Sequence, residues 1–558
     1  MSDTARRARF TDYVPLMRDL RDYERPWFRG DLMAAVTVWA IVVPEAIAYA
    51  SIAGMPPETG LYAATFALLL YAVFASARRV SVGPSAAVAA LSFSTIAPLA
   101  AAGTEDFVTL TVVLAILVGV ILVVAGLAHM GVVADFLSDP VLKGFIVGVA
   151  LTIALGQAGK LFGFETEGEG FFVELSDLIR QLPDSHLATM MVGAASLIAL
   201  FLLERFVPRI PSVLLVVIGS ILAAKWLDLS ERGVHVVGDI PAGLPSFAVP
   251  SAPWSAVVAL VPGAIGVAIV VYGESMALAK TFGSRHGERV DADQELIALG
   301  AGNVAGGLFG GFTSNASNAR SAAGDAAGQK TQVSSLIVVA FLVVTLLFLT
   351  PVFTDLPEAA LGAIVIHAVA RLIKFRPISA LRGRNVVDFW AAVTTLLGVL
   401  VLDVLAGLMI GVLVSLAGLM SRAVRPRIVW LGTDQASGRL VDRDRDEADI
   451  TPEIAVVQFG AELFFANVGS FRDAVFAEIE VGRPRAILID AEAITDIDTT
   501  AADELVKLHQ ELGSLDVVLA FARLQEPARQ AMELAGLDLS DRDFARVEDA
   551  IDRLADQL

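Results

Sequence analysis

The chain has 558 residues, 56% of them hydrophobic, and a formal net charge of −19. It contains no cysteine, which excludes disulfides and thiolate metal sites. Apolar runs of about 20 residues, long enough to cross a bilayer, recur along the sequence, and a water-soluble protein does not carry so many. We therefore predict an α-helical membrane protein that crosses the bilayer many times.

The negative charge is concentrated near the C-terminus. Residues 428–558 contain 28 Asp and Glu against 12 Lys and Arg, whereas the preceding residues are almost balanced, with 32 acidic and 29 basic side chains. This contrast predicts an N-terminal segment over 1–30, a transmembrane domain over 31–425 and an acidic water-soluble domain over 426–558.

Fourteen apolar segments, some of them short, are predicted to span the membrane. They lie at 32–52, 60–77, 85–101, 108–127, 140–162, 189–206, 212–228, 258–281, 293–309, 317–327, 331–350, 357–375, 386–402 and 404–421. The positive-inside rule tests this number, because cytoplasmic connections are rich in Lys and Arg. With a cytoplasmic N-terminus, the basic connections all fall on that side: 1–29, 78–79, 205–209, 280–289, 330, 371–384 and 422–427. The Glu-rich connection 163–186 and the connection 351–358 then lie outside, and the acidic domain is cytoplasmic.

One predicted span contains both a proline and a carboxylate. In AIVVPEAIAYA (residues 40–50), Glu45 directly follows Pro44. Proline interrupts the hydrogen bonding of a helix, and a buried Glu is costly unless it is neutral or paired. A pair of this kind within a span indicates a polar site inside the membrane.

The same pattern recurs later in the chain. AIVVYGESMALA (268–279) resembles 40–50 and places Glu274 after a glycine, and VGPSAAVAA (82–90) corresponds to SNASNARSAAG (314–324) at nearly the same offset. Seven predicted spans separate the copies, so the copies run in opposite directions through the bilayer. This arrangement is typical of inverted-repeat transporters, whose sites lie between broken helices at the midplane. Chance similarity between Ala- and Val-rich helices is the alternative.

The second pair of segments predicts an anion site. Pro84 suits the first turn of a helix and Ser317 can cap another, so that two helix N-termini would face each other. Their free N–H groups and partial positive charge favour an anion. Arg320 adds a full positive charge, and an arginine within a membrane is a functional candidate. Pairing of Arg320 with a carboxylate such as Glu274 is the structural alternative, and the two roles are compatible.

Four motifs together cover much of the membrane part. They are PEAIAYASIAGMPPETGLYAA (44–64), VSVGPSAAVAALS (80–92), ESMALAKTFGSRHGERVDADQELIALGAGNVAGGLFGGF (274–312) and SNARSAAGDAAGQKTQ (317–332). With these motifs the chain resembles the SulP family of anion transporters, the sulfate-permease-like group. The resemblance implies fourteen helices in a seven-plus-seven inverted repeat, a core domain that moves against a gate domain in an elevator-like manner, an anion between the third and tenth helices, and a homodimer.

The resemblance also implies the site residues. On the first helix they are Glu45 and Tyr49, four apart and so on one face. The other substrate-binding positions are Gly83, Pro84, Ser85 and Ala86 on the third helix and Ser317, Asn318, Ala319 and Arg320 on the tenth, and Glu274 is the acidic position of the eighth. Glu45 stands where the family most often has Gln, which adds a titratable group. Ala319 stands where the family often has Ser. Because this hydroxyl is missing, the resemblance does not determine which anion is the substrate.

The acidic C-terminal domain resembles a STAS domain through IAVVQFGAELFFANVGSFRDAV (454–475) and RAILIDAEAITDIDTTAADELVKLHQEL (485–512). The pattern of strand, capped helix and a further strand, DVVLAFA (516–522), independently predicts a small α/β domain. In soluble relatives a Ser or Thr at this place is phosphorylated, which makes Thr499 and Thr500 candidates for phosphorylation and implies a regulatory protein that binds the domain. A simple helix cap is the alternative role of Thr499.

The sequence favours secondary active transport of a small anion of the sulfate, bicarbonate or dicarboxylate class by proton-coupled symport in an inner membrane. Glu45 is the expected proton-coupling group and Glu274 the next candidate; a permanently neutral Glu45 that donates a hydrogen bond as Gln would is the alternative. An uncoupled exchanger or a channel-like anion pathway regulated by the STAS domain is the second interpretation. A membrane enzyme and an interaction platform built on the acidic tail are further alternatives.

Several activities are disfavoured. No G-x-x-x-x-G-K-[ST] motif occurs, which argues against direct ATP drive. No His pair has metal spacing, and we interpret His235 and His367 as lone structural or loop residues. We expect no cofactor, no metal, no catalytic residue and no nucleic-acid partner. Sodium coupling ranks below proton coupling, because no further carboxylate lies near Glu274.

Overall fold

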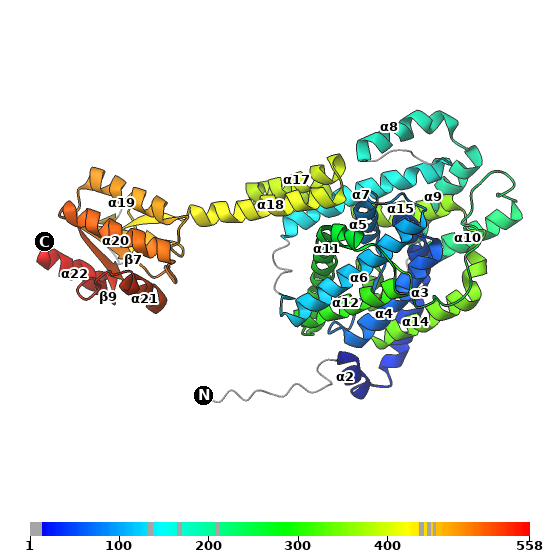
Figure 1. Cartoon of the computed structure of the whole chain (residues 1–558), viewed down its shortest axis with the longest axis horizontal. Coiled ribbons are helices and arrows are strands. Elements are labelled where there is room, and N and C mark those ends of the chain that lie inside the picture. Colours follow the sequence, from blue (N-terminus) through cyan, green and yellow to red (C-terminus); the bar gives the residue numbers. More distant parts are fainter. Residues whose placement is uncertain are drawn as a thin grey trace. The chain divides into compact units, whose positions relative to one another are not determined.

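The computed structural model describes residues 14–131, 138–164, 170–206, 212–434, 440–443, 448–449 and 453–558. The predicted basic residues within 1–13, the acidic residues within 165–169 and Arg209 lie outside these ranges. The chain divides into two compact units, Met1–Ser415 and Leu416–Leu558 (Figure 1). Each unit has a hydrophobic core of its own.

Each of the fourteen predicted spans corresponds to a helix within the described ranges. The first seven are α3 (Trp27–Ile52), α4 (Pro57–Phe74), α5 (Ala86–Ile96), α6 (Glu105–Leu127), α7 (Asp139–Phe162), α9 (Leu187–Phe206) and α10 (Ser212–Trp226). The second seven are α11 (Trp254–His286), α12 (Ala292–Leu308), α13 (Asn318–Ala326), α14 (Val333–Val344), α15 (Glu358–Ala370), α17 (Val386–Val401) and α18 (Val404–Val424). In the described part, eight helical segments are long and apolar enough to cross a membrane, and α5, α10 and α17 are shorter apolar helices.

Two features of the first unit differ from the prediction. The connection 163–186 contains the helix α8 (Phe171–Gln181), whose apolar residues Phe172, Leu175 and Ile179 follow helical spacing over too short a stretch to form a span. The predicted span 331–350 is not one regular helix. It continues beyond α14 as a π-helical turn (Thr345–Leu349) and then a 3-10 turn (Thr350–Phe353). Pro351 in the second turn cannot continue an α-helix.

The helices of the first unit pack in two groups (Figure 1). The core group consists of α3, α4, α5, α6, α11, α12, α13 and α14, and the gate group consists of α7, α9, α10, α15, α17 and α18. Within the core group α6 and α12 approach so closely that a Cβ atom on Gly300 would lie 2.6 Å from the carbonyl oxygen of Gly119. The groups meet where α3 packs against α10 and α15, and where α5 packs against α7.

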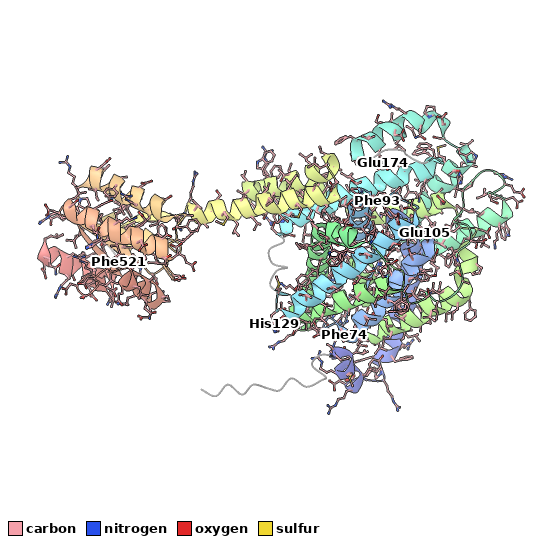
Figure 2. The ribbon with its side chains drawn as sticks, in the orientation of Figure 1. Phe74, Phe93, Glu105, His129, Glu174 and Phe521 are labelled. Carbon is pink, nitrogen blue, oxygen red and sulfur yellow. The ribbon has the colours of Figure 1, made fainter. Side chains whose placement is uncertain are left out.

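Figure 2 shows the side chains on the helices of the first unit and labels Phe74, Phe93 and Glu105. Phe74 ends α4, and Glu105 lies in the first turn of α6. The ring of Phe93 on α5 contacts that of Phe107 on α6, with centroids 5.6 Å apart. This contact fixes the short helix α5 within the core group.

Two short strands join the halves of the repeat. β1 (Val82–Gly83) precedes α5, and β2 (Asn315–Ala316) precedes α13. They pair antiparallel, with Val82 opposite Ala316 and Gly83 opposite Asn315. Antiparallel pairing of equivalent strands is the geometry that two oppositely oriented copies require, which agrees with the inverted repeat.

The second unit is an α/β domain. Its sheet has the order β4-β3-β6-β7-β8-β9, with β5 also paired to β3; β6 to β9 run parallel. The strands are β3 (Ile428–Asp434), β4 (Leu440–Asp442), β5 (Ala448–Asp449), β6 (Ile454–Phe459), β7 (Ala486–Asp490), β8 (Val518–Ala522) and β9 (Asp543–Phe544). The helices are α19 (Val468–Gly482), α20 (Thr499–Ser514), α21 (Glu526–Leu534) and α22 (Val547–Gln557). Phe521 of β8 is buried in its core (Figure 2).

The predicted strands and helix of this domain are confirmed, but the predicted cap is wrong. Thr499 is the first residue of α20, and Asp498 is its N-cap. The Asp498 carboxylate accepts a hydrogen bond from the backbone N–H of Ala501 at 2.7 Å. A carboxylate is a stronger acceptor than a threonine hydroxyl and also suits the positive end of the helix.

Candidate functional site

The site is built around the two short strands. The Ser317 N–H donates to the carbonyl oxygen of Ser81 at 2.9 Å, which extends the strand pairing by one bond. α5 then begins at Ala86 with Ser85 as N-cap, and α13 begins at Asn318 with Ser317 as N-cap. The helices therefore start directly after the two paired strands. Each N-terminus carries unpaired N–H groups and a partial positive charge.

The two caps differ in a way that concerns binding. The Ser317 hydroxyl accepts from the backbone N–H of Arg320 at 3.4 Å, as the sequence predicts. The Ser85 hydroxyl makes no capping bond, and in the described part of the chain its buried oxygen has no hydrogen-bond partner. Pro84 lies outside α5, before the cap, so the prediction that it occupies the first turn is wrong. Its carbonyl oxygen is used instead, as an acceptor for Arg320.

Arg320 is the largest fully buried side chain described. Its Nη1 donates to Glu45 Oε2 and to the Pro84 carbonyl oxygen, both at 2.9 Å. Its Nε and Nη2 are buried and have no partner among the described residues. A Cβ atom on Gly83 would lie 3.3 Å from Nη2, so a glycine keeps this side of the guanidinium free of a side chain. Unpaired buried N–H groups on a cation suit an anionic ligand.

Glu45 and Tyr49 lie one turn apart on α3, with exposed fractions of 5% and 6%. Pro44 precedes Glu45 inside the helix and supplies no N–H to the backbone ladder. The carboxylate of Glu45 is the ion-pair partner of Arg320, although 275 residues separate the two. The predicted pairing of Arg320 with a carboxylate is therefore confirmed, but the partner is Glu45 and not Glu274.

Glu274 has a different neighbour. Its Oε2 accepts from Asn315 Nδ2 at 2.6 Å, and the adjacent Ser275 hydroxyl accepts from the Ala316 N–H at 3.0 Å. Both contacts are to β2, so α11 holds the strand that leads into α13. Glu274 thus holds the strand that leads into α13, and among the described contacts none joins Glu274 to the Arg320 guanidinium.

The remaining predicted positions lie around these groups. Gly83, Pro84 and Ala86 are buried, whereas Asn318 and Ala319 in the first turn of α13 are exposed. The first turn of α13 is thus open on the side of Asn318 and Ala319 and closed on the side of Arg320. Within the described residues no group of three or more His, Asp or Glu could hold a metal ion.

A network that the sequence analysis missed fixes the segments on either side of the site. Asp31 of α3 is fully buried and accepts from the N–H groups of Lys330 and Thr331, at 2.7 and 3.1 Å, and from the Thr331 hydroxyl at 2.7 Å. Gln332 Nε2 donates to the carbonyl oxygens of Ala77 and Val80, at 2.7 and 2.9 Å. The segment after α13 is thereby tied to α3 and to the segment before β1. The polar run GQKTQ (328–332) is the feature of the sequence that could have indicated this network.

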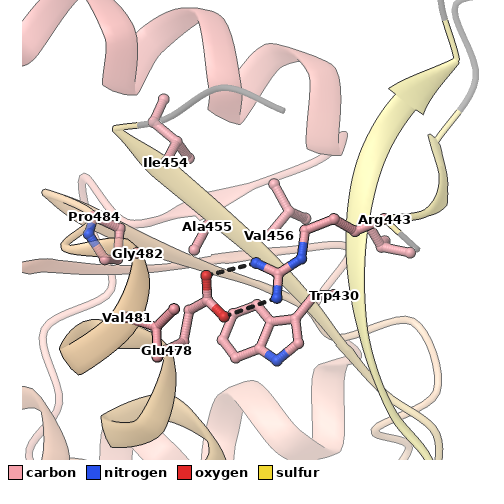
Figure 3. Close-up of a pocket in the computed structure, with 10 residues that line it drawn as sticks. Trp430, Arg443, Ile454, Ala455, Val456, Glu478, Val481, Gly482 and Pro484 are labelled. Atoms are coloured by element: carbon pink, nitrogen blue, oxygen red, sulfur yellow. Dashed lines mark hydrogen bonds and ion pairs between the residues drawn. The ribbon is translucent and has the colours of Figure 1, made fainter. Parts of the chain in front are cut away.

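The second unit places Thr499 and Thr500 on its surface, in the first turn of α20. A separate hollow of about 280 Å³ lies between β6 and the end of α19 (Figure 3). There Arg443 pairs with both oxygens of Glu478, with Nη2 to Oε2 at 3.0 Å, and its guanidinium lies near the Trp430 ring, 5.6 Å from the centroid. Arg443 and Glu478, two charged residues that line the hollow, are therefore paired with each other.

Residues 28–395 match the family described as "Sulfate permease family", and residues 447–550 match the STAS domain. The probable sulfate transporter Rv1739c of Mycobacterium tuberculosis is 34% identical over 528 residues, 94% of each chain. Sulfate transporter 4.1, chloroplastic, of Arabidopsis thaliana is 29% identical and covers 98% of this chain and 84% of that protein. Solute carrier family 26 member 6 of Homo sapiens is 30% identical over 495 residues, which are 83% of this chain and 64% of that protein.

Solved structures resemble both units. The structure of murine Slc26a9, an anion transporter, superimposes with a TM-score of 0.92 at 22% identity, over 100% of this chain and 97% of that chain. The transmembrane domain of the cyanobacterial bicarbonate transporter BicA superimposes with a TM-score of 0.62 at 18% identity, over 70% of this chain and 98% of that chain. At these identities the likeness shows the fold.

Proposed function

The chain belongs to the sulfate permease family and carries a STAS domain, and from this premise we propose that it moves a small anion across the membrane by proton-coupled symport. The family is one of transporters, and we infer neither an enzymatic activity nor a cofactor. Sulfate, bicarbonate and small dicarboxylates are the proposed substrate class. Sulfate transport by its relatives, as their names state, supports the first of these.

One observation carries the proposal. Arg320 Nε and Nη2 and the Ser85 hydroxyl, which have no hydrogen-bond partner among the described residues, belong to the first turn of α13 and to the N-cap of α5. All these groups can donate hydrogen bonds, and the two helix N-termini add partial positive charge. An oxyanion of a few atoms would satisfy them together, and helix N-termini bind such groups through backbone N–H donors. The proposed substrate-binding set is the ten positions predicted from the sequence: Glu45, Tyr49, Gly83, Pro84, Ser85, Ala86, Ser317, Asn318, Ala319 and Arg320.

The contact between Glu45 and Arg320 supports coupling to protons. An ionised Glu45 occupies Arg320 Nη1 and repels an incoming anion. A protonated Glu45 releases that positive charge to the anion and removes the repulsion. Proton and anion then each raise the affinity of the other by the same factor. Glu274 is the second proton-coupling candidate, because it contacts the strand that leads into α13.

The division of the first unit supports an elevator-like movement. The groups that hold the anion belong to the core group, and only a few helices of that group touch the gate group. We propose that the core group, with the strands β1 and β2, moves as one body against the gate group. Its internal hydrogen bonds, such as those of Asp31, would keep the site intact during the movement.

We further propose an inner-membrane homodimer with residues 31–425 in the bilayer. Segment 1–30 and the STAS domain, 426–558, would lie in the cytoplasm, as the distribution of Lys and Arg favours. Exposed Thr499 and Thr500 would then be accessible to a protein kinase and to a regulatory protein that binds the STAS domain.

Uptake by the purified protein in liposomes tests the function. Radiolabelled sulfate, bicarbonate, a dicarboxylate, chloride and nitrate are compared at two external pH values, with and without an inward proton gradient. Saturable uptake that accumulates against its gradient only when protons flow inward supports symport. Saturable exchange without such accumulation supports an uncoupled exchanger, and flux that does not saturate supports a channel-like pathway.

A further inference from the structure

The helix α8 turns its apolar side chains away from the protein. Phe172, Val173 and Ile179 are 56%, 55% and 58% exposed. Phe172 and Ile179 are seven residues apart and so lie on one face of the helix, and Val173 is next to Phe172 on that side. A single exposed apolar side chain is normal on a protein surface, whereas a group of them on one side of a short helix marks an interaction surface.

The opposite side of α8 is polar and lies toward the protein. Glu174, Asp177 and Gln181 follow at helical spacing, and all three are only partly exposed. Gln181 Nε2 donates to Asp177 Oδ2 at 2.8 Å. The helix packs against α7 and α17 of the gate group (Figure 1). A helix beside water buries its apolar side and exposes its polar side. The reversed arrangement of α8 indicates that its exposed side has apolar surroundings.

α8 lies beside the last turns of α7 and not beyond its end. A Cβ atom on Gly156 of α7 would lie 3.1 Å from Oε1 of Glu174, which is labelled in Figure 2. Gly156 precedes the last residue of α7, Phe162, by six residues, which is about 9 Å along a helix. α7 is long and apolar enough to cross a membrane. The position of α8 therefore corresponds to the depth at which lipid headgroups meet acyl chains.

The exposed apolar surface continues along the chain. Only residues 182–186 separate α8 from α9, a helix that is also long and apolar enough to cross a membrane. Leu187 and Met191 in the first turns of α9 are 62% and 58% exposed, so these side chains face lipid in a bilayer. Arg180 is exposed at the edge of the apolar side of α8, where a guanidinium can reach a lipid phosphate.

We propose that α8 is an interfacial helix that binds bilayer lipid through Phe172, Val173 and Ile179. These side chains insert among the acyl chains, and the axis of the helix lies along the membrane surface. Because α8 packs against α7 and α17, its insertion fixes the gate group at one depth in the bilayer. The inference concerns the contact with lipid and holds whichever anion is transported.

A spin label tests the surroundings of α8, because the chain contains no cysteine and one introduced cysteine is labelled alone. Ser176 is exposed and lies between Phe172 and Ile179 on the apolar side, so Ser176→Cys removes no apolar side chain. Met191→Cys on α9 is the reference for lipid. Ala102→Cys, at an exposed position between α5 and α6, is the reference for water. The labelled full-length proteins are studied in phosphatidylcholine liposomes by electron paramagnetic resonance.

Collisions of the label with oxygen, which concentrates in lipid, are compared with collisions with a water-soluble nickel chelate. At Ser176→Cys and Met191→Cys the ratio of oxygen to nickel collisions should exceed one, and at Ala102→Cys it should fall below one. A ratio at Ser176→Cys like that at Ala102→Cys would place α8 in water and overturn the inference. A label that neither agent reaches would also overturn it, since a second copy of the chain would then cover this side. Ile179→Cys repeats the measurement if Ser176→Cys folds poorly.

Discussion

Arg320 and Glu45 form a buried ion pair of 2.9 Å that joins α13 to α3. The pair uses only Nη1 of the guanidinium and leaves Nε and Nη2 without partners among the described residues. A guanidinium that is paired only through Nη1 can still bind an anion through Nε and Nη2. The relationship therefore connects a titratable carboxylate to an anion site through a single side chain.

Removal of the Arg320 charge should nearly abolish anion binding. Truncating one partner of a buried charge pair costs about 2–5 kcal/mol, so Arg320→Gln should weaken anion affinity by about 100-fold. Arg320→Lys keeps the charge but loses the planar fork, and we expect partial activity. Binding of labelled anion to purified protein measures both. An Arg320→Gln protein with unchanged affinity would show that this arginine has a purely structural role.

The two N-cap serines, Ser85 and Ser317, should differ in role: we expect Ser85 to affect anion binding and Ser317 to affect stability. The Ser85 hydroxyl makes no hydrogen bond within the described part of the chain. Ser85→Ala should therefore lower anion affinity about tenfold, as the loss of one hydrogen bond to a charged partner does, without changing thermal stability.

Ser317→Ala is the contrasting variant, because the Ser317 hydroxyl caps α13. We expect this variant to lose about 1 kcal/mol of stability. Thermal unfolding in detergent and anion binding are measured on both proteins. If Ser85→Ala binds the anion as tightly as the unaltered protein, its hydroxyl is not a donor to the substrate.

Asp31 should stabilise the core group. Replacing it with Ala leaves the N–H groups of Lys330 and Thr331 without their acceptor. An unsatisfied buried group such as the Thr331 N–H costs about 1–3 kcal/mol. Asp31→Ala should therefore unfold at a clearly lower temperature. Asp22→Ala, at an exposed position shortly before α3, is the control and should have the melting temperature of the unaltered protein. Equal melting temperatures for the two variants would contradict this role.

The STAS domain should lose stability in acid through His509. Burial of its ring and the nearby guanidinium of Arg542 hold the pKa of His509 below its usual value. Between that lowered pKa and the unfolded value of about 6.5, the unfolded chain binds the proton more readily. The free energy of unfolding should therefore fall as pH decreases below about 6.5 and stay constant with respect to this group above it.

Hydrogen exchange of the α20 amides in the full-length protein, corrected for the intrinsic effect of pH, measures this change. His509→Gln removes the titrating group and should lose less protection in acid than the unaltered protein does. An identical pH dependence in both proteins would exclude His509 as a source of the acid sensitivity.

Much of the membrane unit follows from local sequence patterns. Apolar runs predict the fourteen helices. The small residues around Pro84 and Ser317 predict where the two short helices α5 and α13 begin inside the unit. The partner of Arg320 could not be predicted, because Glu45 and Glu274 occupy equivalent places in the repeat and only the fold decides which one the guanidinium reaches. The interpretation of His367 as a lone residue is wrong for the same reason, since its partner Glu204, with Oε2 2.8 Å from His367 Nε2, lies on a different helix.

The central claim is that Glu45 couples protons to the anion, and one measurement tests it most directly. Sulfate uptake is followed in proteoliposomes that contain either the unaltered protein or Glu45→Gln, with an inward proton gradient and, separately, with sulfate exchange and no gradient. The account predicts that the unaltered protein concentrates sulfate, whereas Glu45→Gln exchanges sulfate but no longer accumulates it and loses its dependence on pH. Accumulation by Glu45→Gln with an unchanged pH dependence would contradict the account and would direct attention to Glu274.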